Sequence, residues 1–214
     1  MDLRRTWAIV PIRGLATAKT RLGPDLDPAA RRELVEAMLR QTLAATRDAR
    51  TVAGTVVVTM DPAAAGIAHE HHAIGLVERA PGLNAAIDAA RSVAVARGAT
   101  AVLVLPADLP AISPSVIDAL VTAAASVRVA GDLEAATALV AVVADRHGHG
   151  TNALLLSPPT VIGPAFGVES RAVHHAAALS AGARWLELDG PLTLDVDTPA
   201  DLAVARAMVG PLGR

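Results

Sequence analysis

Residues 101–110, which read AVLVLPADLP, combine an entirely apolar run with one carboxylate between two prolines. The run 101–105 predicts a β-strand that is covered on both faces, as in the centre of a parallel sheet. Because proline has no N–H to donate to a neighbouring strand, the strand must end near Pro106. Asp108 then lies just beyond the carboxyl end of a central strand, where open α/β sheets bind ligands. A simple turn would also place an aspartate there, so the rest of the chain must decide its role.

Further apolar runs alternate with segments that have the periodicity of amphipathic helices. The expected strands are residues 7–11, 55–59, 74–77, 101–105, 136–144, 153–156 and 184–188. Helices are expected after Asp27, near Asn84, at Pro114, near Ser170 and after Thr198. Asp27 and Thr198 can each cap a helix that starts with proline, and Asp201 is placed to complete a capping box with Thr198. This alternation predicts an α/β fold with a mixed, mostly parallel central sheet flanked by helices, in a single domain over 1–214.

The composition excludes two classes of partner. One Phe, two Trp and no Tyr leave few rings on which nucleic acid could stack, and a net charge of −2 offers no basic surface for phosphate backbones. The longest apolar runs, such as 138–144, are far shorter than the roughly 20 residues that span a bilayer. The absence of cysteine removes disulfides and thiolate metal sites. We therefore expect a soluble, cytoplasmic protein that binds neither nucleic acid nor a membrane.

The first expected strand is followed by a loop with three cationic side chains, Arg13, Lys19 and Arg21. Lys19 is the only lysine among 19 basic residues, and a compact ammonium can serve as a point charge against phosphate. The loop has neither the G-x-x-x-x-G-K-[ST] pattern of a P-loop nor the G-x-G-x-x-G pattern of a dinucleotide site. It is therefore a candidate phosphate site of another kind.

Two further aspartates, Asp195 and Asp197, lie two positions apart in an extended segment, so both side chains point to one side and Val196 to the other. With Asp108 they would place three carboxylates at strand ends, opposite the basic first loop. Carboxylates at one site repel one another unless a cation joins them, and oxygen ligands without His or Cys indicate Mg²⁺. Two ions about 3.5 to 4 Å apart would suit a displacement at phosphorus.

Two glycine-containing segments are further candidates for binding. Residues 145–152, DRHGHGTN, connect two expected strands and either offer backbone amides to a ligand or form a flexible hairpin. His147 and His149 in this loop, and the run HEHH at 69–72, lack the partners or spacing of a metal site, so we expect them at the surface. Gly167 and Ser170 flank the amino end of an expected helix, where free N–H groups favour an anion.

Six segments carry a resemblance to a known family: PIRGLATAKTRL, PGLNAA, LPADLP, GTNALLL, FGVES and LDVDTPADL. In this order and spacing, and over nearly the whole chain, the sequence resembles the guanylyltransferases of coenzyme F-420 biosynthesis. These enzymes act on 2-phospho-L-lactate or phosphoenolpyruvate. The resemblance implies a nucleotidyltransferase fold that is glycosyltransferase-A-like and Rossmann-like. It also implies transfer of GMP from GTP, with release of pyrophosphate.

The resemblance implies a role for each matching residue. Mg²⁺ would lie on Asp108, Asp195 and Asp197, and Asp108 would act in catalysis with Lys19 and Arg21. The nucleotide would contact Arg13, Lys19 and Arg21 through its phosphates, and Gly82 and Asn84 through its guanine. The acceptor would contact Thr151, Gly167 and Ser170. One departure from the family is Arg13, which stands where lysine is expected.

The acceptor is favoured to be phosphoenolpyruvate by the resemblance to actinobacterial members, with 2-phospho-L-lactate as the alternative. A molybdenum-cofactor guanylyltransferase is disfavoured because the first loop lacks a G-G-x-S-x-R-M-G pattern. An inactive, nucleotide-binding regulatory subunit is disfavoured because it would have no physical reason to keep Lys19 and three mutually repelling carboxylates. Two partners stay open: a downstream transferase that receives the short-lived product, and a second copy of the chain in a homodimer.

Overall fold

A computed structural model of the chain describes residues 2–79, 82–126, 138–210 and 212. Its strands are β1 (Thr6–Pro11), β2 (Val52–Thr59), β3 (Ile74–Val77), β4 (Ala101–Val104), β5 (Leu139–Ala144), β6 (Thr151–Ser157) and β7 (Arg184–Glu187). Its α-helices are α1 (Pro28–Asp48), α2 (Pro62–Glu70), α3 (Leu83–Ala96), α4 (Pro114–Ser126), α5 (Ser170–Ser180) and α6 (Pro199–Val209). Two short 3-10 helices complete the described elements, η1 (Thr20–Leu22) and η2 (Pro191–Thr193).

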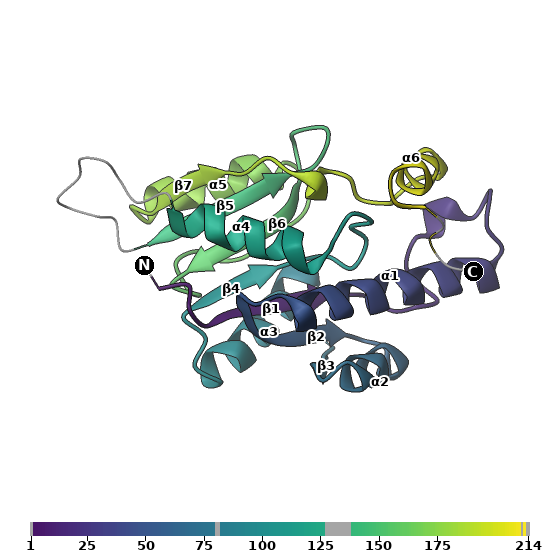
Figure 1. Ribbon diagram of the computed structural model, residues 1–214, viewed down its shortest axis with the longest axis horizontal. Coiled ribbons are helices and arrows are strands. Elements are labelled where there is room, and N and C mark those ends of the chain that lie inside the picture. The colour runs from purple at the N-terminus through teal and green to yellow at the C-terminus, as the bar shows by residue number, and fades with distance from the viewer. Residues whose placement is uncertain (1, 80–81, 127–137, 211, 213–214) are drawn as a thin grey trace.

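The strands of the described residues form one sheet in the order β3-β2-β1-β4-β6-β5-β7 (Figure 1). β6 runs antiparallel to both of its neighbours, β4 and β5, whereas the other neighbouring pairs are parallel. The antiparallel pair β5 and β6 needs only the short connection 145–150, while parallel neighbours need a crossover. The predicted α/β fold with a mixed, mostly parallel sheet is confirmed.

Side chains alternate between the two faces of the sheet along each strand, and apolar residues on both faces pack against helices. Leu103 and Leu155 pack on one face with α4 and the end of α1. Val102 and Leu154, their neighbours in sequence, pack on the opposite face with α3 and α5. The central strand β4 is therefore buried from both sides, as its continuous apolar run predicts.

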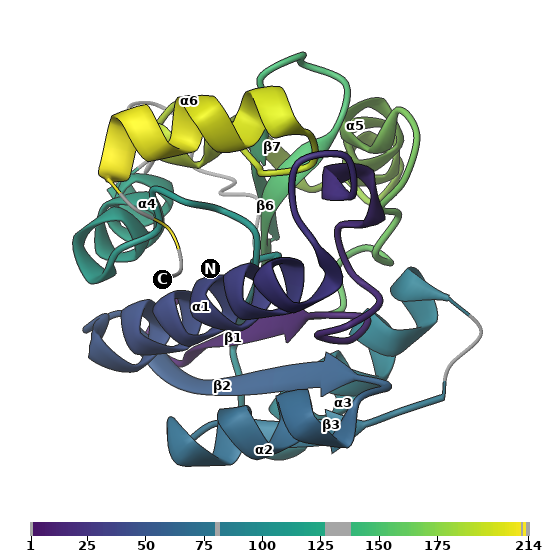
Figure 2. The ribbon, with the colours of Figure 1, turned by 90° about the vertical axis from the view of Figure 1, so that its right-hand side faces the viewer.

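The last part of the chain returns to the first. Leu194, Val196 and Leu202 belong to the same core cluster as Leu15 and Leu22 of the first loop. Figure 2 shows η1 of this loop beside the amino-terminal end of α6. This packing brings residues from both ends of the sequence to the edge where β1 and β4 finish.

The observed elements differ from the expected ones mainly at their starts. Thr151 and Asn152 are expected in a loop, but they begin β6 and are buried. β2 begins at Val52, where Gly54 allows the ring of Trp7 to approach, since a Cβ at Gly54 would come within 2.7 Å of a ring carbon. The expected strand 136–144 is β5 from Leu139 onward. Its residues 136–137, like Pro81 before α3, lie outside the described residues.

Local signals of the sequence are confirmed at the helix ends, whereas the histidine run 69–72 lies at the surface only in part, since His71 is half-buried. Asp27 Oδ1 accepts a hydrogen bond of 2.8 Å from the backbone of Ala30, and Thr198 forms a capping box with Asp201. In the run 69–72, Glu70 pairs with Arg40, and the run joins no group of metal-binding geometry within the described part of the chain. None of the described helices is both long and apolar enough to cross a membrane.

Candidate active site

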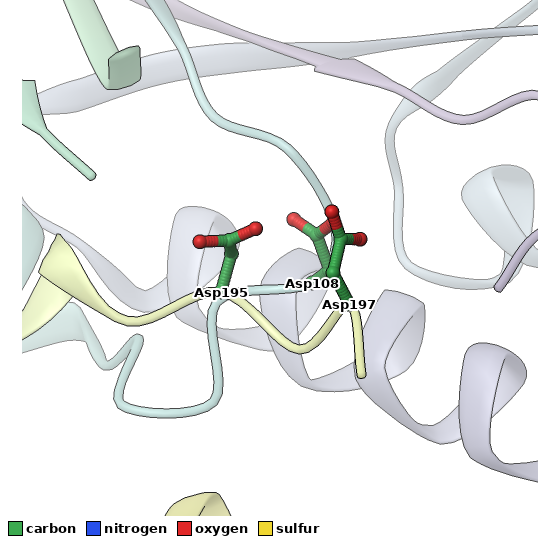
Figure 3. Close-up of side chains that lie close together, drawn as sticks. All are labelled: Asp108, Asp195 and Asp197. Atoms are coloured by element: carbon green, nitrogen blue, oxygen red, sulfur yellow. The ribbon is translucent and has the colours of Figure 1, made fainter. Parts of the chain in front are cut away.

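Three carboxylates meet beyond the end of β4. Asp108 follows β4, while Asp195 and Asp197 precede α6, and Figure 3 shows the three side chains pointing the same way. One oxygen of each carboxylate lies within 4.8 Å of an oxygen of the other two. A backbone hydrogen bond of 3.0 Å from Val196 to Asp108 joins the two segments, and the Val196 side chain is fully buried. The predicted convergence of these carboxylates is confirmed.

Lys19 from the first loop contacts this carboxylate cluster. Its Nζ donates hydrogen bonds to Asp108 and, at 2.6 Å, to Oδ1 of Asp197. Burial opposes the charged ammonium, but the two carboxylates outweigh it, so the pKa of Lys19 is raised above its usual value. Arg21 is mostly exposed, and its Nη1 lies 3.8 Å from Oδ2 of Asp197. The loop therefore keeps a permanent positive charge beside the carboxylates.

The surroundings of Asp195 oppose its ionisation. Burial raises its pKa, and the negative charges of Asp108 and Asp197 raise it further. Its Oδ1 accepts a hydrogen bond of 3.4 Å from Asn152, whose amide also donates to backbone carbonyls of the η2 turn at 3.0 Å. Asn152 thereby ties the start of β6 to the segment that carries Asp195.

The cluster has the properties of a site for a hard cation. Oδ1 of Asp108 is buried and has no hydrogen-bond partner within the described residues, which is costly for a carboxylate oxygen. When ionised, Asp108, Asp195 and Asp197 carry −3 and Lys19 carries +1, which leaves −2. One divalent cation would balance this charge, and carboxylate oxygens are the ligands that Mg²⁺ prefers. The donor set therefore fits the expected metal.

The first loop is held by Asp61, which follows β2. Oδ2 of Asp61 accepts a hydrogen bond of 3.0 Å from the backbone of Leu15, and Oδ1 caps α2 by accepting 2.9 Å from Ala63. The loop approaches so closely that a Cβ at Gly14 would lie 3.3 Å from the Cβ of Asp61. Lys19 itself has a φ of 56°, in the left-handed region that residues other than glycine rarely adopt.

A hollow of about 230 Å³ opens beside the carboxylate cluster. Its lining includes Arg13, Lys19, Pro106, Asp108 and Asp197, so the basic loop and two of the carboxylates share one opening. Another hollow, of about 280 Å³, lies between α4 and residues 188–192 and shares none of these residues. The charged groups identify the first hollow as the candidate active site.

The predicted acceptor residues form a second cluster. Thr151 begins β6 and Ser170 begins α5, and Oγ of Ser170 donates to Oγ1 of Thr151 at 3.3 Å. Nδ1 of the fully buried His174 lies 3.1 Å from the same oxygen. Gly167 is exposed, has a φ of 141°, and accepts a hydrogen bond of 3.2 Å from the backbone of Ser170. We call Thr151, Ser170 and His174 the hydroxyl cluster.

The residues expected to border guanine lie at the start of α3. Gly82 is exposed and has a φ of 118°. Asn84 does not cap the helix with its side chain but pairs with the backbone of Phe166, donating 3.1 Å to its carbonyl and accepting 2.8 Å from its N–H. Asn84 therefore supports the loop before α5, and its contact with guanine stays a prediction.

Comparison with known proteins adds to this geometry. Residues 6–206 match a protein family described as guanylyl transferase CofC like. The chain belongs to this family. It is 42% identical over 199 residues to the phosphoenolpyruvate guanylyltransferase of Sphaerobacter thermophilus, an alignment that covers 92% of this chain and 90% of that protein. It is 41% identical over 208 residues to the enzyme of the same name from Conexibacter woesei, covering 95% and 88%.

A solved structure is similar to this chain in fold. A nucleotidyl transferase from Methanothermobacter superposes with a TM-score of 0.60 at 17% identity, covering 96% of this chain and 97% of that one. At this identity the likeness concerns the fold alone. The nucleotidyltransferase fold that the sequence resemblance implies is thereby confirmed.

The loop 145–150 between β5 and β6 of this CofC-like chain has a structural role. His147 and His149 are exposed, as predicted. Arg146 in the same loop forms an ion pair of 2.5 Å with the buried Asp201, which also accepts a hydrogen bond of 3.2 Å from the backbone of Asp197. Asp201 is therefore structural, as expected, and it joins the loop to the carboxylate cluster.

Sequence reasoning missed three supporting residues of the CofC-like site. Asn152 holds Asp195, Asp61 holds the first loop, and His174 contacts Thr151. Two of them had a signal: Asn152 stands inside the segment GTNALLL, and His174 follows Ser170 by one helical turn. Nothing in the sequence indicated that Asp61 contacts the first loop, since an aspartate before a proline is an ordinary helix cap.

Proposed function

We propose that this CofC-like chain transfers GMP from GTP to the phosphate of phosphoenolpyruvate, giving enolpyruvoyl-diphospho-guanosine and pyrophosphate in coenzyme F-420 biosynthesis. Two similar proteins that bear the name phosphoenolpyruvate guanylyltransferase align over 92% and 95% of this chain. The observation that carries the proposal is the carboxylate cluster with Lys19 at its side, next to a hollow that also presents Arg13.

The chemistry of the acceptor explains what the site must provide. An oxygen of the acceptor phosphate forms a bond to the α-phosphorus of GTP, the bond to the bridging oxygen breaks, and pyrophosphate leaves. A phosphomonoester has its second pKa near about 6, so the attacking oxygen is already largely anionic at neutral pH and needs no general base. The difficulty is to bring two anions together, which suits a site built from cations and metal-binding carboxylates.

The first loop is proposed to bind the triphosphate. Lys19 stays charged because its pKa is raised by the carboxylates beside it, and Arg13 and Arg21 extend the positive charge along the loop. In-line displacement depends on such positioning and charge stabilisation. Gly82 and Asn84, at the start of α3, are proposed to border the guanine.

Asp108, Asp195 and Asp197 are proposed to hold Mg²⁺. A bound Mg²⁺ would neutralise the phosphates and stabilise the charge that develops at the α-phosphorus. The partnerless Oδ1 of Asp108 and the raised pKa of Asp195 both support a cation here, because each reflects a carboxylate in need of a positive partner. Two ions are proposed, since the triphosphate adds negative charge of its own to the −2 of the cluster.

Thr151, Gly167 and Ser170 are proposed to bind the acceptor. The hydroxyl of Thr151 is a hydrogen-bond donor, and the hydroxyl of Ser170 supports it at 3.3 Å. Ser170 also opens α5, where the helix dipole favours an anion. Thr151 and Asn152 are adjacent at the start of β6, so one strand end carries both a proposed acceptor residue and the amide that contacts Asp195.

The test measures pyrophosphate release from GTP, ATP, CTP and UTP, each with phosphoenolpyruvate, 2-phospho-L-lactate or 3-phosphoglycerate, with and without Mg²⁺. We expect release only with GTP, with phosphoenolpyruvate as the best acceptor and with a requirement for Mg²⁺. If GTP yields no pyrophosphate with any acceptor, the proposal fails. A clear preference for 2-phospho-L-lactate would keep the reaction and change the acceptor.

A further inference from the structure

His174 lies at the centre of the hydroxyl cluster and is fully buried. Its Nε2 accepts a hydrogen bond of 2.9 Å from the backbone N–H of Ala165, in the loop before α5. Its Nδ1 lies 3.1 Å from Oγ1 of Thr151. The rings of Phe166 and His174 pack in a T-shaped arrangement, with 5.3 Å between their centroids. The imidazole is therefore held by a contact at each nitrogen and by the packing of Phe166 against the ring.

These contacts determine where the ring hydrogen lies. A backbone N–H can only donate, so Nε2 must keep its lone pair and Nδ1 must carry the hydrogen of the neutral ring. Burial lowers the pKa of His174 to about 4, so the ring is neutral at neutral pH. Nδ1 then donates to Thr151.

The hydroxyl of Thr151 is constrained in turn. A hydroxyl oxygen has two lone pairs, and Oγ1 accepts one hydrogen bond from His174 and another, at 3.3 Å, from Ser170. With both lone pairs in use, the hydroxyl can engage a further group only by donating its own hydrogen. A group bound there must therefore be an acceptor, and an anionic oxygen is the strongest one.

We propose that His174 is a positioning residue that makes Thr151 a hydrogen-bond donor to an anionic oxygen of the acceptor substrate. The inference rests on the proposed function, because that function places the acceptor against Thr151 and Ser170. His174 also holds the loop with Gly167 through Ala165, so one side chain orients both the donor and the backbone beside it.

Two substitutions of His174 separate these roles. In His174→Asn the amide nitrogen can take the place of Nδ1, which keeps the donor to Thr151 and loses the bond to Ala165. In His174→Gln the amide oxygen can take the place of Nε2, which keeps the bond to Ala165 and loses the donor. Each variant loses one hydrogen bond, so thermal unfolding checks that the two are comparably folded.

We expect His174→Gln to raise KM for phosphoenolpyruvate about tenfold, the effect of one hydrogen bond to a charged group, with KM for GTP unchanged. We expect His174→Asn, which keeps the donor to Thr151, to raise the acceptor KM clearly less than His174→Gln does, with KM for GTP unchanged. In a Thr151→Val background, His174→Gln should have no further effect on the acceptor KM. Equal effects of the two variants on both substrates would show a purely structural role and overturn the proposal.

A measurement without turnover separates this inference from the proposed function. In the parent protein, ¹⁵N NMR of the histidine rings at pH 7 should assign His174 as neutral with the hydrogen on Nδ1. A hydrogen on Nε2 would refute the inference whatever the enzyme does. If the parent releases no pyrophosphate from GTP and phosphoenolpyruvate while the Nδ1 hydrogen is found, the proposed function fails and the hydrogen-bond geometry stands.

Discussion

Nζ of Lys19 lies 2.6 Å from Oδ1 of Asp197, although 178 positions separate the two residues in sequence. The same ammonium bonds to Asp108, so the first loop, the end of β4 and the lead into α6 meet at one positive charge. The three carboxylates and this lysine form a unit with a residual charge of −2, which explains why the candidate site suits a divalent cation. Five predictions test the unit and the residues around it.

Lys19→Met should uncouple metal binding from turnover. Without Mg²⁺ the variant should lose about 1 to 2 kcal/mol of stability, a figure reduced for the exposure of Asp197, because three carboxylates lose their cation. Added Mg²⁺ should then raise its melting temperature more than that of the parent, while pyrophosphate release falls sharply. Lys19→Arg keeps the charge and serves as the control. A smaller Mg²⁺ effect in Lys19→Met than in the parent would contradict this account.

Asp108→Asn should abolish the response to Mg²⁺. The substitution keeps the shape of the side chain but removes the charge and one oxygen ligand, so pyrophosphate release should fall by about 100-fold or more. The melting temperature measured with GTP should no longer rise on addition of Mg²⁺. Asp189→Asn, at an exposed aspartate, is the matched control and should behave like the parent. If Asp108→Asn keeps the full Mg²⁺ response, the metal lies elsewhere.

Ser170→Ala should impair use of the acceptor more than use of the nucleotide. The hydroxyl of Ser170 supports Thr151 at 3.3 Å and opens the anion-favouring end of α5. We expect KM for phosphoenolpyruvate to rise several-fold, by about one hydrogen bond, with KM for GTP unchanged. Ser180→Ala, at the exposed far end of the same helix, is the control. Equal changes in both KM values would remove Ser170 from the acceptor site.

Asp61→Asn should destabilise the first loop, because it replaces one carboxylate oxygen by an NH₂ group. Both oxygens of Asp61 accept backbone N–H groups, so an amide must leave either Leu15 or Ala63 facing a donor. We expect about 1 to 2 kcal/mol of lost stability and a higher KM for GTP. Asp27→Asn is the matched control, because its hydrogen bond to Ala30 uses one oxygen and asparagine caps helices equally well. A loss of the same size in both variants would argue against a special role for Asp61.

Acid should destabilise the protein through His174. In the unfolded chain His174 has a pKa of about 6.5, whereas burial lowers its pKa in the folded protein to about 4. The neutral ring therefore contributes its full stability above pH 6.5, and this contribution is lost as the pH falls towards 4. The slope should approach about 1.4 kcal/mol per pH unit, and the total about 3 kcal/mol. Urea unfolding from pH 7 to 4.5 should include this contribution in the parent and in the exposed-site control His72→Asn. The slope should be flatter in His174→Asn, and parallel curves would contradict the assignment.

The central features of the fold could be predicted from the sequence because they depend on local patterns. Continuous apolar runs indicate strands that are buried on both faces, and a capping residue followed by proline marks a helix start wherever it occurs. The alternation of Asp195, Val196 and Asp197 placed two carboxylates on one side and an apolar side chain on the other. Polar residues inside a buried strand were misjudged, since the partners that make Thr151 and Asn152 tolerable there come from distant segments.

Pairings between distant segments were decided only by the tertiary structure. No local pattern states that Lys19 bonds to Asp108 and Asp197, that β6 runs antiparallel between β4 and β5, or that Asp61 holds the first loop. The ring hydrogen of His174 follows from an N–H of Ala165, a contact that exists only once the loop has folded back on α5. The sequence by itself determined which chemical groups the chain carries and which face each one takes. Close packing in three dimensions determined which of them meet, because hydrogen bonds and ion pairs act over only a few ångströms.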